Sequence, residues 1–291
     1  MLSIEAIASY KRTKEIIEKY SFYFRKNYGQ NFLIDMHVIN KIMTVSDITK
    51  EDLVIEVGPG IGSLTQAIAE RAGKVIALEI DKNLIPILGE TLAGYDNIEI
   101  INQDVLKSDI QEIIEKSGYK SVKMVSNLPY YITTPIIMTF LESRQAVKSI
   151  TVMMQKEVSE RINAKPSTKA YGSLSLAVQY YAEVSLGANV PQNCFIPRPN
   201  VDSAVLHLKI LDNPKVSVSN EELMFKIIKY AFAQRRKTLV NSLFNMKGLE
   251  LTKEELIKII KSCGLDEKVR GEALNLEDYA SLSNTIGNLK Q

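Results

Sequence analysis

Cysteine and histidine are scarce in this sequence of 291 residues, which holds two of each. Two cysteines, Cys194 and Cys263, cannot form a disulfide framework or a cysteine-rich zinc site. Two histidines, His37 and His207, argue against a metal centre and against mechanisms that rely on a Ser-His-Asp or Cys-His arrangement. We therefore expect the chemistry to come from carboxylates, amides, backbone groups or a bound cofactor.

An excess of one charge and long apolar segments are also missing. Lys and Arg number 36 and Asp and Glu 34, so the net charge is +2 and says little about partners. Basic residues nevertheless gather in residues 1–30 and in the run Arg235-Arg236-Lys237. The uncharged stretch 124–141 contains Asn127 and Pro129, which are out of place in a membrane helix. No secretory signal pattern is visible at the N-terminus, and we expect a cytoplasmic protein.

Short apolar runs alternate with helical patterns between residues 53 and 154. The predicted strands cover 53–57, 74–79, 98–102, 122–126 and 149–154. The predicted helices between them cover 63–72, 82–93, 108–116 and 135–143. This alternation indicates an α/β fold, with a parallel sheet and helices on both faces.

The pattern changes in the second half of the chain. Residues 179–186 and 203–211 are predicted to be two antiparallel strands added to the sheet edge. After Pro214 only helices are predicted, over 221–233, 237–244, 253–262 and 276–284. We therefore predict one domain over residues 1–213, with residues 1–30 as a basic N-terminal extension, and a small helical domain over 214–291.

A glycine-rich turn, Gly58-Pro59-Gly60-Ile61-Gly62, closes the first strand and opens the first helix. Glycines there let the backbone turn sharply and come close to a ligand. The spacing is G-x-G-x-G, and Pro59 removes an amide that a pyrophosphate would use, so the loop favours S-adenosylmethionine (SAM) over NAD. Glu79 ends the second strand, where a carboxylate can bind both hydroxyls of a ribose. The alternative is a strand-turn-helix junction that merely needs glycine.

Asp104 follows the third predicted strand and is a candidate acceptor for the amino group of an adenine. Its alternative role is to cap the helical segment that follows. Gly58, Glu79, Asp104 and Asn127 come at the carboxyl ends of four successive strands. Because these ends lie along one edge of a parallel sheet, we expect the four residues to share a ligand site.

The tetrapeptide Asn127-Leu128-Pro129-Tyr130 ends the fourth strand and carries the most specific chemistry in the chain. The amino group of a base is a poor nucleophile because its lone pair is delocalised into the ring. Asn127 Oδ1 and the Leu128 carbonyl can accept its two N–H groups and draw the lone pair out of the ring plane. Pro129 restricts the backbone that aims this carbonyl, and Tyr130 offers a face for stacking. Catalysis then depends on alignment and charge distribution.

With these motifs in place, the chain resembles the ribosomal-RNA adenine N6-dimethyltransferases. It is most similar to the KsgA/RsmA family, which modifies two adjacent adenines near the 3′ end of the small-subunit rRNA. Three further segments carry the resemblance, which covers about residues 10–285: 26–33 (KNYGQNFL), 195–203 (FIPRPNVDS) and 232–237 (FAQRRK).

The resemblance implies a seven-stranded methyltransferase sheet with a small C-terminal helical domain that binds rRNA. It implies SAM contacts from six residues, to which the glycine turn adds Gly60: Asn31, Leu33, Gly58, Glu79, Asp104 and Asn127. Tyr130 and Phe195 would sandwich the target adenine. Arg235, Arg236, Lys237 and Lys26 would contact RNA phosphates. The implied partner is 16S rRNA in the small ribosomal subunit, with a monomeric enzyme and an added role in subunit biogenesis.

Several alternatives stay open at this point. Phe195 could be an ordinary hydrophobic anchor, and the basic run could be a solvated helix face. The related large-subunit methyltransferases that confer macrolide resistance share the tetrapeptide chemistry, but Leu128 and the loop 195–203 argue against them. A non-catalytic ribosome assembly factor would not need the complete catalytic set. A nicotinamide-dependent dehydrogenase gives no role to the tetrapeptide.

Overall fold

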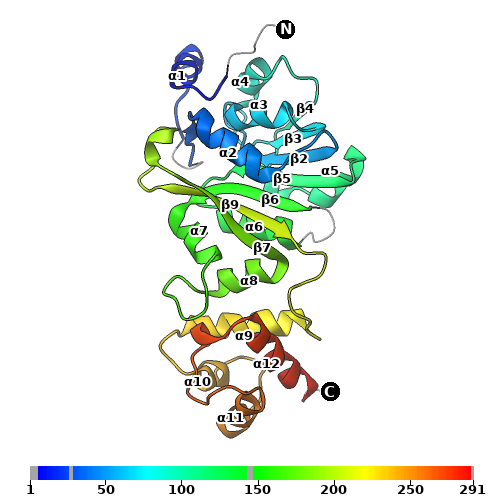
Figure 1. Ribbon diagram of the computed structural model, residues 1–291, viewed down its shortest axis with the longest axis vertical. Helices are drawn as coiled ribbons and strands as arrows, with labels where there is room; N and C mark the ends of the chain where they lie inside the picture. The colour runs from blue at the N-terminus through cyan, green and yellow to red at the C-terminus, as the bar shows by residue number, and fades with distance from the viewer. Residues whose placement is uncertain (1–5, 26–28, 143–146, 290–291) are drawn as a thin grey trace. The chain divides into compact units, whose positions relative to one another are not determined.

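The computed structural model describes residues 6–25, 29–142 and 147–289 (Figure 1). Packing divides the chain into two compact units. The first is Met1–Ser159 with Glu183–Asp212, and the second is Glu160–Ala182 with Asn213–Gln291. The predicted division after residue 213 differs from this in one segment. Residues 160–182, which the sequence predicts to belong to the first domain, group with the C-terminal helices.

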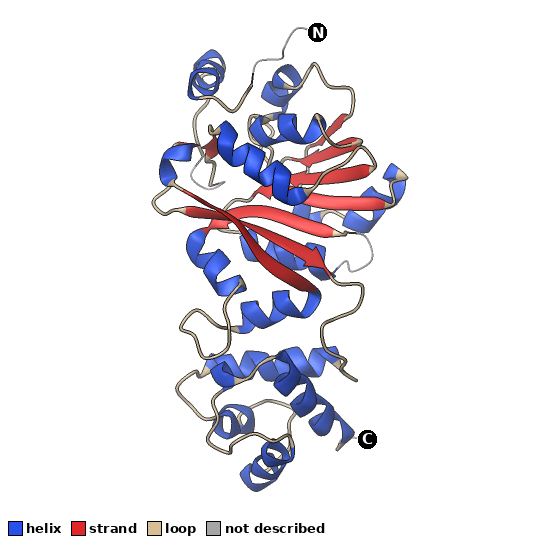
Figure 2. Ribbon diagram, viewed as in Figure 1, coloured by secondary structure: helices blue, strands red, loops and turns tan. Residues whose placement is uncertain are grey.

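The first unit is built around a seven-stranded sheet in the order β4-β3-β2-β5-β6-β9-β7 (Figure 2). The strands are β2 (Asp52–Val57), β3 (Lys74–Leu78), β4 (Ile98–Ile101), β5 (Ser121–Asn127), β6 (Ser149–Gln155), β7 (Ala182–Val190) and β9 (Ser203–Ile210). Neighbours among β2 to β6 pair in parallel, and β9 pairs antiparallel with β6. The prediction of a seven-stranded α/β fold is confirmed. The strand order reverses between β2 and β5, which is where such sheets bind ligands.

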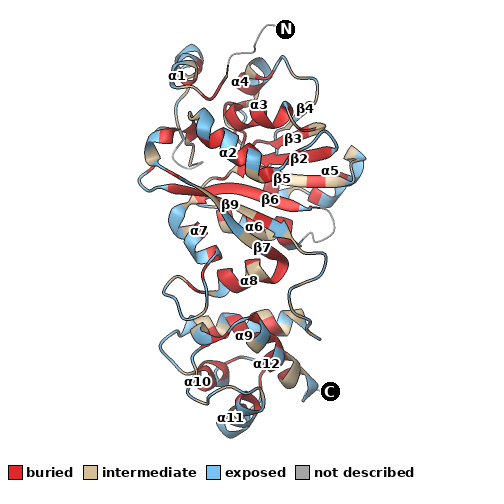
Figure 3. Cartoon of the chain, viewed as in Figure 1, coloured by how far each residue is buried: buried red, intermediate tan, exposed pale blue. Residues whose placement is uncertain are grey.

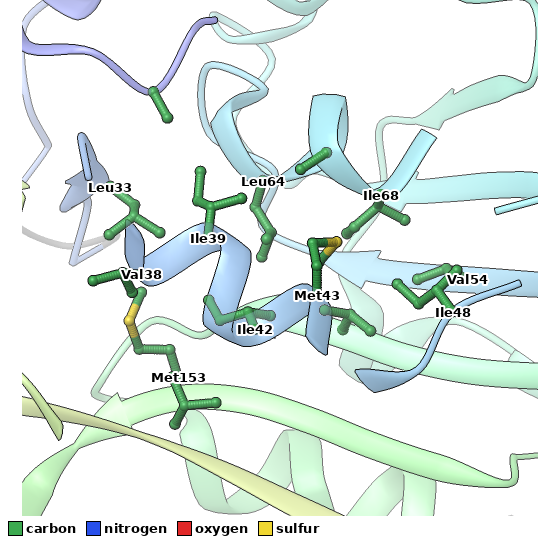
Figure 4. Close-up of a cluster of buried hydrophobic side chains, with 14 of the residues drawn as sticks. Leu33, Val38, Ile39, Ile42, Met43, Ile48, Val54, Leu64, Ile68 and Met153 are labelled. Atoms are coloured by element: carbon green, nitrogen blue, oxygen red, sulfur yellow. The ribbon is translucent and has the colours of Figure 1, made fainter. Parts of the chain in front are cut away.

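The centre of the sheet is buried on both faces. All six residues of β2 are buried, as the red strands in Figure 3 show. Helices α2 (Met36–Ser46) and α3 (Ser63–Ala69) cover one face, and their Ile39, Ile42 and Ile68 belong to the buried cluster drawn in Figure 4. Helices α5 (Ile110–Ser117) and α6 (Thr133–Glu142) lie on the opposite side of the sheet in Figure 2. Strands that are buried along their whole length are typical of sheets covered by helices on both faces.

The predicted N-terminal extension packs against the sheet unit over its described residues. It forms α1 (Tyr10–Lys19), and its Ile7, Ile16, Phe22 and Phe24 pack in a cluster that includes Leu88 of α4 (Ile85–Thr91). Farther along, β1 (Phe32–Leu33) pairs antiparallel with β8 (Phe195–Ile196). This ladder brings the N-terminal motif beside the proline-rich loop, across more than 160 residues of chain.

One predicted strand is wrong in its first residues. Tyr180 and Tyr181 end helix α8 (Ser173–Tyr181), and β7 begins only at Ala182. Aromatic and β-branched residues suggested a strand, but Leu174, Val178 and Tyr181 recur at helical spacing and are all buried. The first turn is fixed by the Gly172 N–H, which donates to Ser175 Oγ at 3.1 Å. The two strands do lie at the sheet edge as predicted.

The second unit is helical. Besides α8 it contains α9 (Glu221–Ala233), α10 (Leu239–Phe244), α11 (Lys253–Ser262) and α12 (Leu276–Asn288), close to the predicted ranges. Side chains of Asn220, Thr252 and Asn275 cap the first turns of three of them, which satisfies free backbone N–H groups. Helix α7 (Lys156–Ile162) and the 3₁₀ turns η2 (Val105–Lys107), η3 (Gln192–Cys194) and η4 (Gly271–Ala273) complete the described elements. Among the described residues, no helix has the length and apolar character needed to cross a bilayer.

Candidate active site

A cavity lies at the carboxyl ends of β2, β3 and β5, where the strand order reverses. Most of the sequence-predicted site residues line it: Asn31, Leu33, Gly58, Gly60, Glu79, Asp104, Asn127, Leu128, Pro129 and Tyr130. The strand ends and the segment 29–33 thus meet around one ligand-sized space. This matches the expectation that parallel strands deliver these residues to one edge.

The glycine turn has a backbone conformation that larger residues rarely adopt, and Gly60 and Gly62 also have close neighbours. Gly58, Gly60 and Gly62 have φ values of +70°, +61° and +93°, a region that favours glycine. A Cβ on Gly60 would lie 3.1 Å from the Phe32 ring. The turn therefore brings bare backbone to the cavity wall.

Glu79 is held at the cavity by backbone donors. Its side chain is 4% exposed, and its Oε1 accepts the Asp81 N–H at 2.7 Å while Oε2 lies 3.4 Å from the Gly60 nitrogen. Burial raises the pKa of Glu79 to about 7, against the lowering effect of these two N–H groups. A carboxyl group in this position can accept hydrogen bonds from ligand hydroxyls.

Glu56 is a site residue that the sequence analysis missed. It lies on β2, lines the cavity and is 1% exposed. Within the described part of the chain, its Oε2 has no hydrogen-bond partner. Burial raises the pKa of Glu56 to about 8, and the nearby Glu79 adds to the shift. The available signal was an acidic residue inside an otherwise apolar strand directly before the glycine turn.

Asp104 serves two purposes. Its Oδ1 accepts the Leu106 N–H at 3.1 Å and so caps η2, as the alternative role required. It also lines the cavity, at the end of β4. The capping bond and a ligand contact are therefore compatible.

The tetrapeptide is held from several sides. Asn127 Nδ2 donates to the Asn31 carbonyl at 3.0 Å, which leaves Oδ1 as the acceptor that a substrate can use. The Leu128 N–H donates to the Met153 carbonyl at 3.0 Å, which fixes the backbone at the end of β5. The Tyr130 hydroxyl lies 2.7 Å from Ser203 Oγ, which restrains the ring. These contacts preorganise the acceptor and the ring before any ligand binds.

Phe195 is the predicted site residue that the structure does not bring to the cavity. It is 1% exposed and belongs to a buried cluster with Leu33, Val38 and Val190. The β1–β8 ladder pairs it with Leu33 and holds it in the core. The structure thus places Phe195 in the core, as its alternative role of a hydrophobic anchor requires, and its stacking on the target adenine stays a prediction.

The predicted RNA-binding residues have different surroundings. Arg235 donates to Glu272 Oε2 at 3.0 Å and to the Lys169 carbonyl at 3.1 Å, so its guanidinium is bound within the helical unit. Arg236 and Lys237 are exposed, and so is Arg235 despite these contacts. Lys26 lies outside the described residues.

Comparisons with known proteins identify several relatives of the chain. The family model described as "Ribosomal RNA adenine dimethylase" matches residues 21–287. "Ribosomal RNA small subunit methyltransferase A" of Lachnoclostridium phytofermentans is 54% identical, with 95% of this chain and 96% of that protein covered. The protein of the same name from Clostridioides difficile is 52% identical, covering 97% and 98%.

Two solved structures resemble the fold. A dimethyladenosine transferase from Plasmodium falciparum has a TM-score of 0.73 at 24% identity, covering 86% of this chain and 95% of that chain. The 23S rRNA methyltransferase ErmE has a TM-score of 0.68 at 25% identity, covering 88% and 100%.

Proposed function

The chain belongs to the ribosomal RNA adenine dimethylase family, and on that premise we propose that it uses SAM to dimethylate the N6 amino groups of two adjacent adenines near the 3′ end of 16S rRNA. The substrate would be the rRNA within the small ribosomal subunit. The 54% identical relative is named as a small-subunit methyltransferase, and that name supports this choice of substrate.

The residues around the cavity fit SAM. When bound, SAM supplies an activated methyl group on a sulfonium centre and carries positive charge. Glu79 would accept the ribose hydroxyls, and Asp104 would accept the adenine amino group. Glu56 supplies a buried, unpaired oxygen within the described chain, suited to a cationic ligand. The bare backbone at Gly58 and Gly60 allows close approach, and Asn31 and Leu33 complete the wall.

The target amino group would be activated by Asn127 and Leu128. Asn127 Oδ1 and the Leu128 carbonyl would accept its two N–H groups, which localises the lone pair on nitrogen and aims it at the methyl group. Tyr130 would stack on the extruded base. No side chain has to take a proton before the transfer, because the amino group attacks in its neutral form.

The contact between Asn127 and Asn31 is the observation that carries this proposal. An amide can turn either its oxygen or its nitrogen toward a substrate. Because Nδ2 donates to the Asn31 carbonyl at 3.0 Å, the oxygen is the atom presented to the base. An adenine amino group, which is a hydrogen-bond donor, matches that choice.

Methylation of the large-subunit rRNA is the alternative. The resemblance to ErmE, with a TM-score of 0.68, supports a shared architecture. Leu128 and the loop 195–203 favour the small-subunit substrate, as does the higher identity to proteins that carry the small-subunit name.

The C-terminal helical domain over residues 214–291 would bind the rRNA, through Arg236 and Lys237, with Lys26 contributing from the N-terminal segment. We further propose that the enzyme acts as a monomer in the cytoplasm. Its binding to the small subunit would assist biogenesis of that subunit.

Methyl-labelled SAM and purified subunits test the substrate. The protein is incubated separately with small subunits that lack the two modifications and with large subunits, and the labelled nucleotides are mapped. We expect label on two adjacent adenines near the 3′ end of 16S rRNA. Label in 23S rRNA alone would favour the alternative, and no label in either would contradict the proposed activity.

A further inference from the structure

Gln30 makes two side-chain hydrogen bonds beside the cavity. Its Nε2 donates to Asp81 Oδ2 at 3.0 Å, and its Oε1 accepts the Arg25 N–H at 2.9 Å. The oxygen of this amide thus faces a donor and its nitrogen faces a carboxylate. The side chain consequently has one favourable orientation, because flipping it would break both hydrogen bonds.

Asp81 is equally constrained. It is 1% exposed, and its Oδ1 accepts the Asn83 N–H at 3.1 Å and Asn83 Nδ2 at 2.9 Å. Its own N–H donates to Glu79 Oε1 at 2.7 Å. Asp81 is therefore fixed on the side of the cavity where Glu79 lies, and Oδ2 is the atom it turns toward Gln30.

The residue after Gln30 acts on the other side of the cavity. The Asn31 carbonyl accepts Asn127 Nδ2 at 3.0 Å, and Asn31 Nδ2 donates to the Gly29 carbonyl at 3.0 Å. The segment 29–31 is thus tied to the loop after β3 through Gln30 and to the end of β5 through Asn31.

We propose that Gln30 and Asp81 are positioning residues for methyl transfer, because their hydrogen bond holds the Asn31 carbonyl that orients the Asn127 amide. Without that carbonyl, the Asn127 amide is free to turn and present Nδ2, a donor, to the donor groups of the substrate. The inference rests on the proposed function but concerns residues to which that proposal gave no role.

Exchanging the two partners provides a sharp test. Gln30→Glu places a carboxylate against Asp81, and Asp81→Asn places an amide nitrogen against Gln30 Nε2, so each single change sets like groups against each other. In the double variant, the amide nitrogen introduced at position 81 would donate to the carboxylate introduced at position 30, while the amide oxygen still accepts from Asn83. The contact is restored with donor and acceptor exchanged. Gln111→Glu is the matched control, since Gln111 makes a similar bond to Glu115 at 2.8 Å on the exposed surface of α5.

The readouts are the single-turnover rate of methyl transfer at saturating SAM, SAM affinity by calorimetry and the melting temperature. We expect each single variant to lose about 10- to 100-fold in rate, as misplacement of a reacting group does, with a smaller change in SAM affinity. The double variant should recover most of the rate, and Gln111→Glu should match the wild type.

Two results would overturn the positioning role: single variants with wild-type rates at saturating SAM, or a double variant that stays as slow as either single variant. An inactive wild type would instead reject the proposed function. The two failures are therefore distinguishable.

Discussion

At the scale of single residues, two buried carboxyl groups dominate the electrostatics of the cavity. Burial and mutual repulsion raise the pKa of Glu56 to about 8, and burial raises that of Glu79 to about 7. Each group therefore binds its proton more tightly in the folded state than in the unfolded chain, whose carboxyl pKa values are about 4.3. The cofactor-free fold consequently favours their neutral forms.

This raised pKa predicts a loss of stability with rising pH. The folded state binds the extra proton, so its contribution to stability is complete below the unfolded pKa and is lost as the pH rises through about 8. We expect the melting temperature of the cofactor-free protein to fall between about pH 5 and about pH 9. Glu56→Gln, which stays neutral, should flatten this profile, whereas the exposed Glu112→Gln should not. Parallel profiles for Glu56→Gln and the wild type would contradict the assignment.

Glu79 should also control cofactor affinity. Glu79→Ala removes an acceptor for ribose hydroxyls. Above about pH 7, where the Glu79 carboxyl group is ionised, a hydrogen bond to this charged group contributes about 1.5–3 kcal/mol. We expect SAM affinity to fall by about tenfold or more, measured by calorimetry, with Glu112→Ala unaffected. Unchanged SAM affinity in Glu79→Ala would contradict the proposed contact between Glu79 and the ribose.

At the scale of secondary-structure elements, the β1–β8 ladder is a contact that local sequence patterns do not predict. The glycine turn, Glu79 and the tetrapeptide could be predicted because each follows directly from a strand end, and parallel strands send their ends to one edge. The burial of Phe195 depends on a two-residue pairing with the distant Leu33, which no local pattern encodes. The contact between Gln30 and Asp81 spans 51 residues and escaped detection for the same reason.

Phe195 should therefore contribute mainly to stability. Replacing a buried phenylalanine with alanine costs about 3–5 kcal/mol, so Phe195→Ala should lower the free energy of unfolding by that order in denaturant titrations. Phe195→Leu keeps an apolar side chain and should restore much of the stability and the methyl-transfer rate. If Phe195→Leu is stable but as slow as Phe195→Ala, the ring itself would be needed for stacking on adenine.

At the scale of the whole molecule, the small net charge of +2 means that attraction to RNA has to be local. The three basic residues at positions 235–237 differ in their contacts. All three side chains are exposed, but Arg235 also pairs with Glu272. The sequence showed the three charges together but could not show that Arg235 pairs with an acidic residue of the helical unit.

Because Arg235 pairs with Glu272, we predict that substitution of Arg235 affects stability and that substitution of Arg236 and Lys237 affects RNA binding. Each lost phosphate contact lowers the slope of log K against log salt by about 0.7–0.9, so Arg236→Ala with Lys237→Ala should flatten it by about 1.4–1.8. SAM affinity should not change. Arg235→Ala should instead lower the melting temperature with a smaller effect on the slope, measured by subunit binding at several salt concentrations. An unchanged slope in the double variant would show that Arg236 and Lys237 are solvated and do not contact RNA phosphates.

The most direct test of the account is the single-turnover rate of Asn127→Ala on small subunits that lack the methylation, measured at saturating SAM beside calorimetry of SAM binding. The central claim is that the oriented Asn127 oxygen activates the adenine amino group. Loss of one preorganised polar group costs about 10²–10³ in rate, so we predict a fall of that size, larger than any change in SAM or subunit affinity. A rate within a few-fold of the wild type would contradict the account.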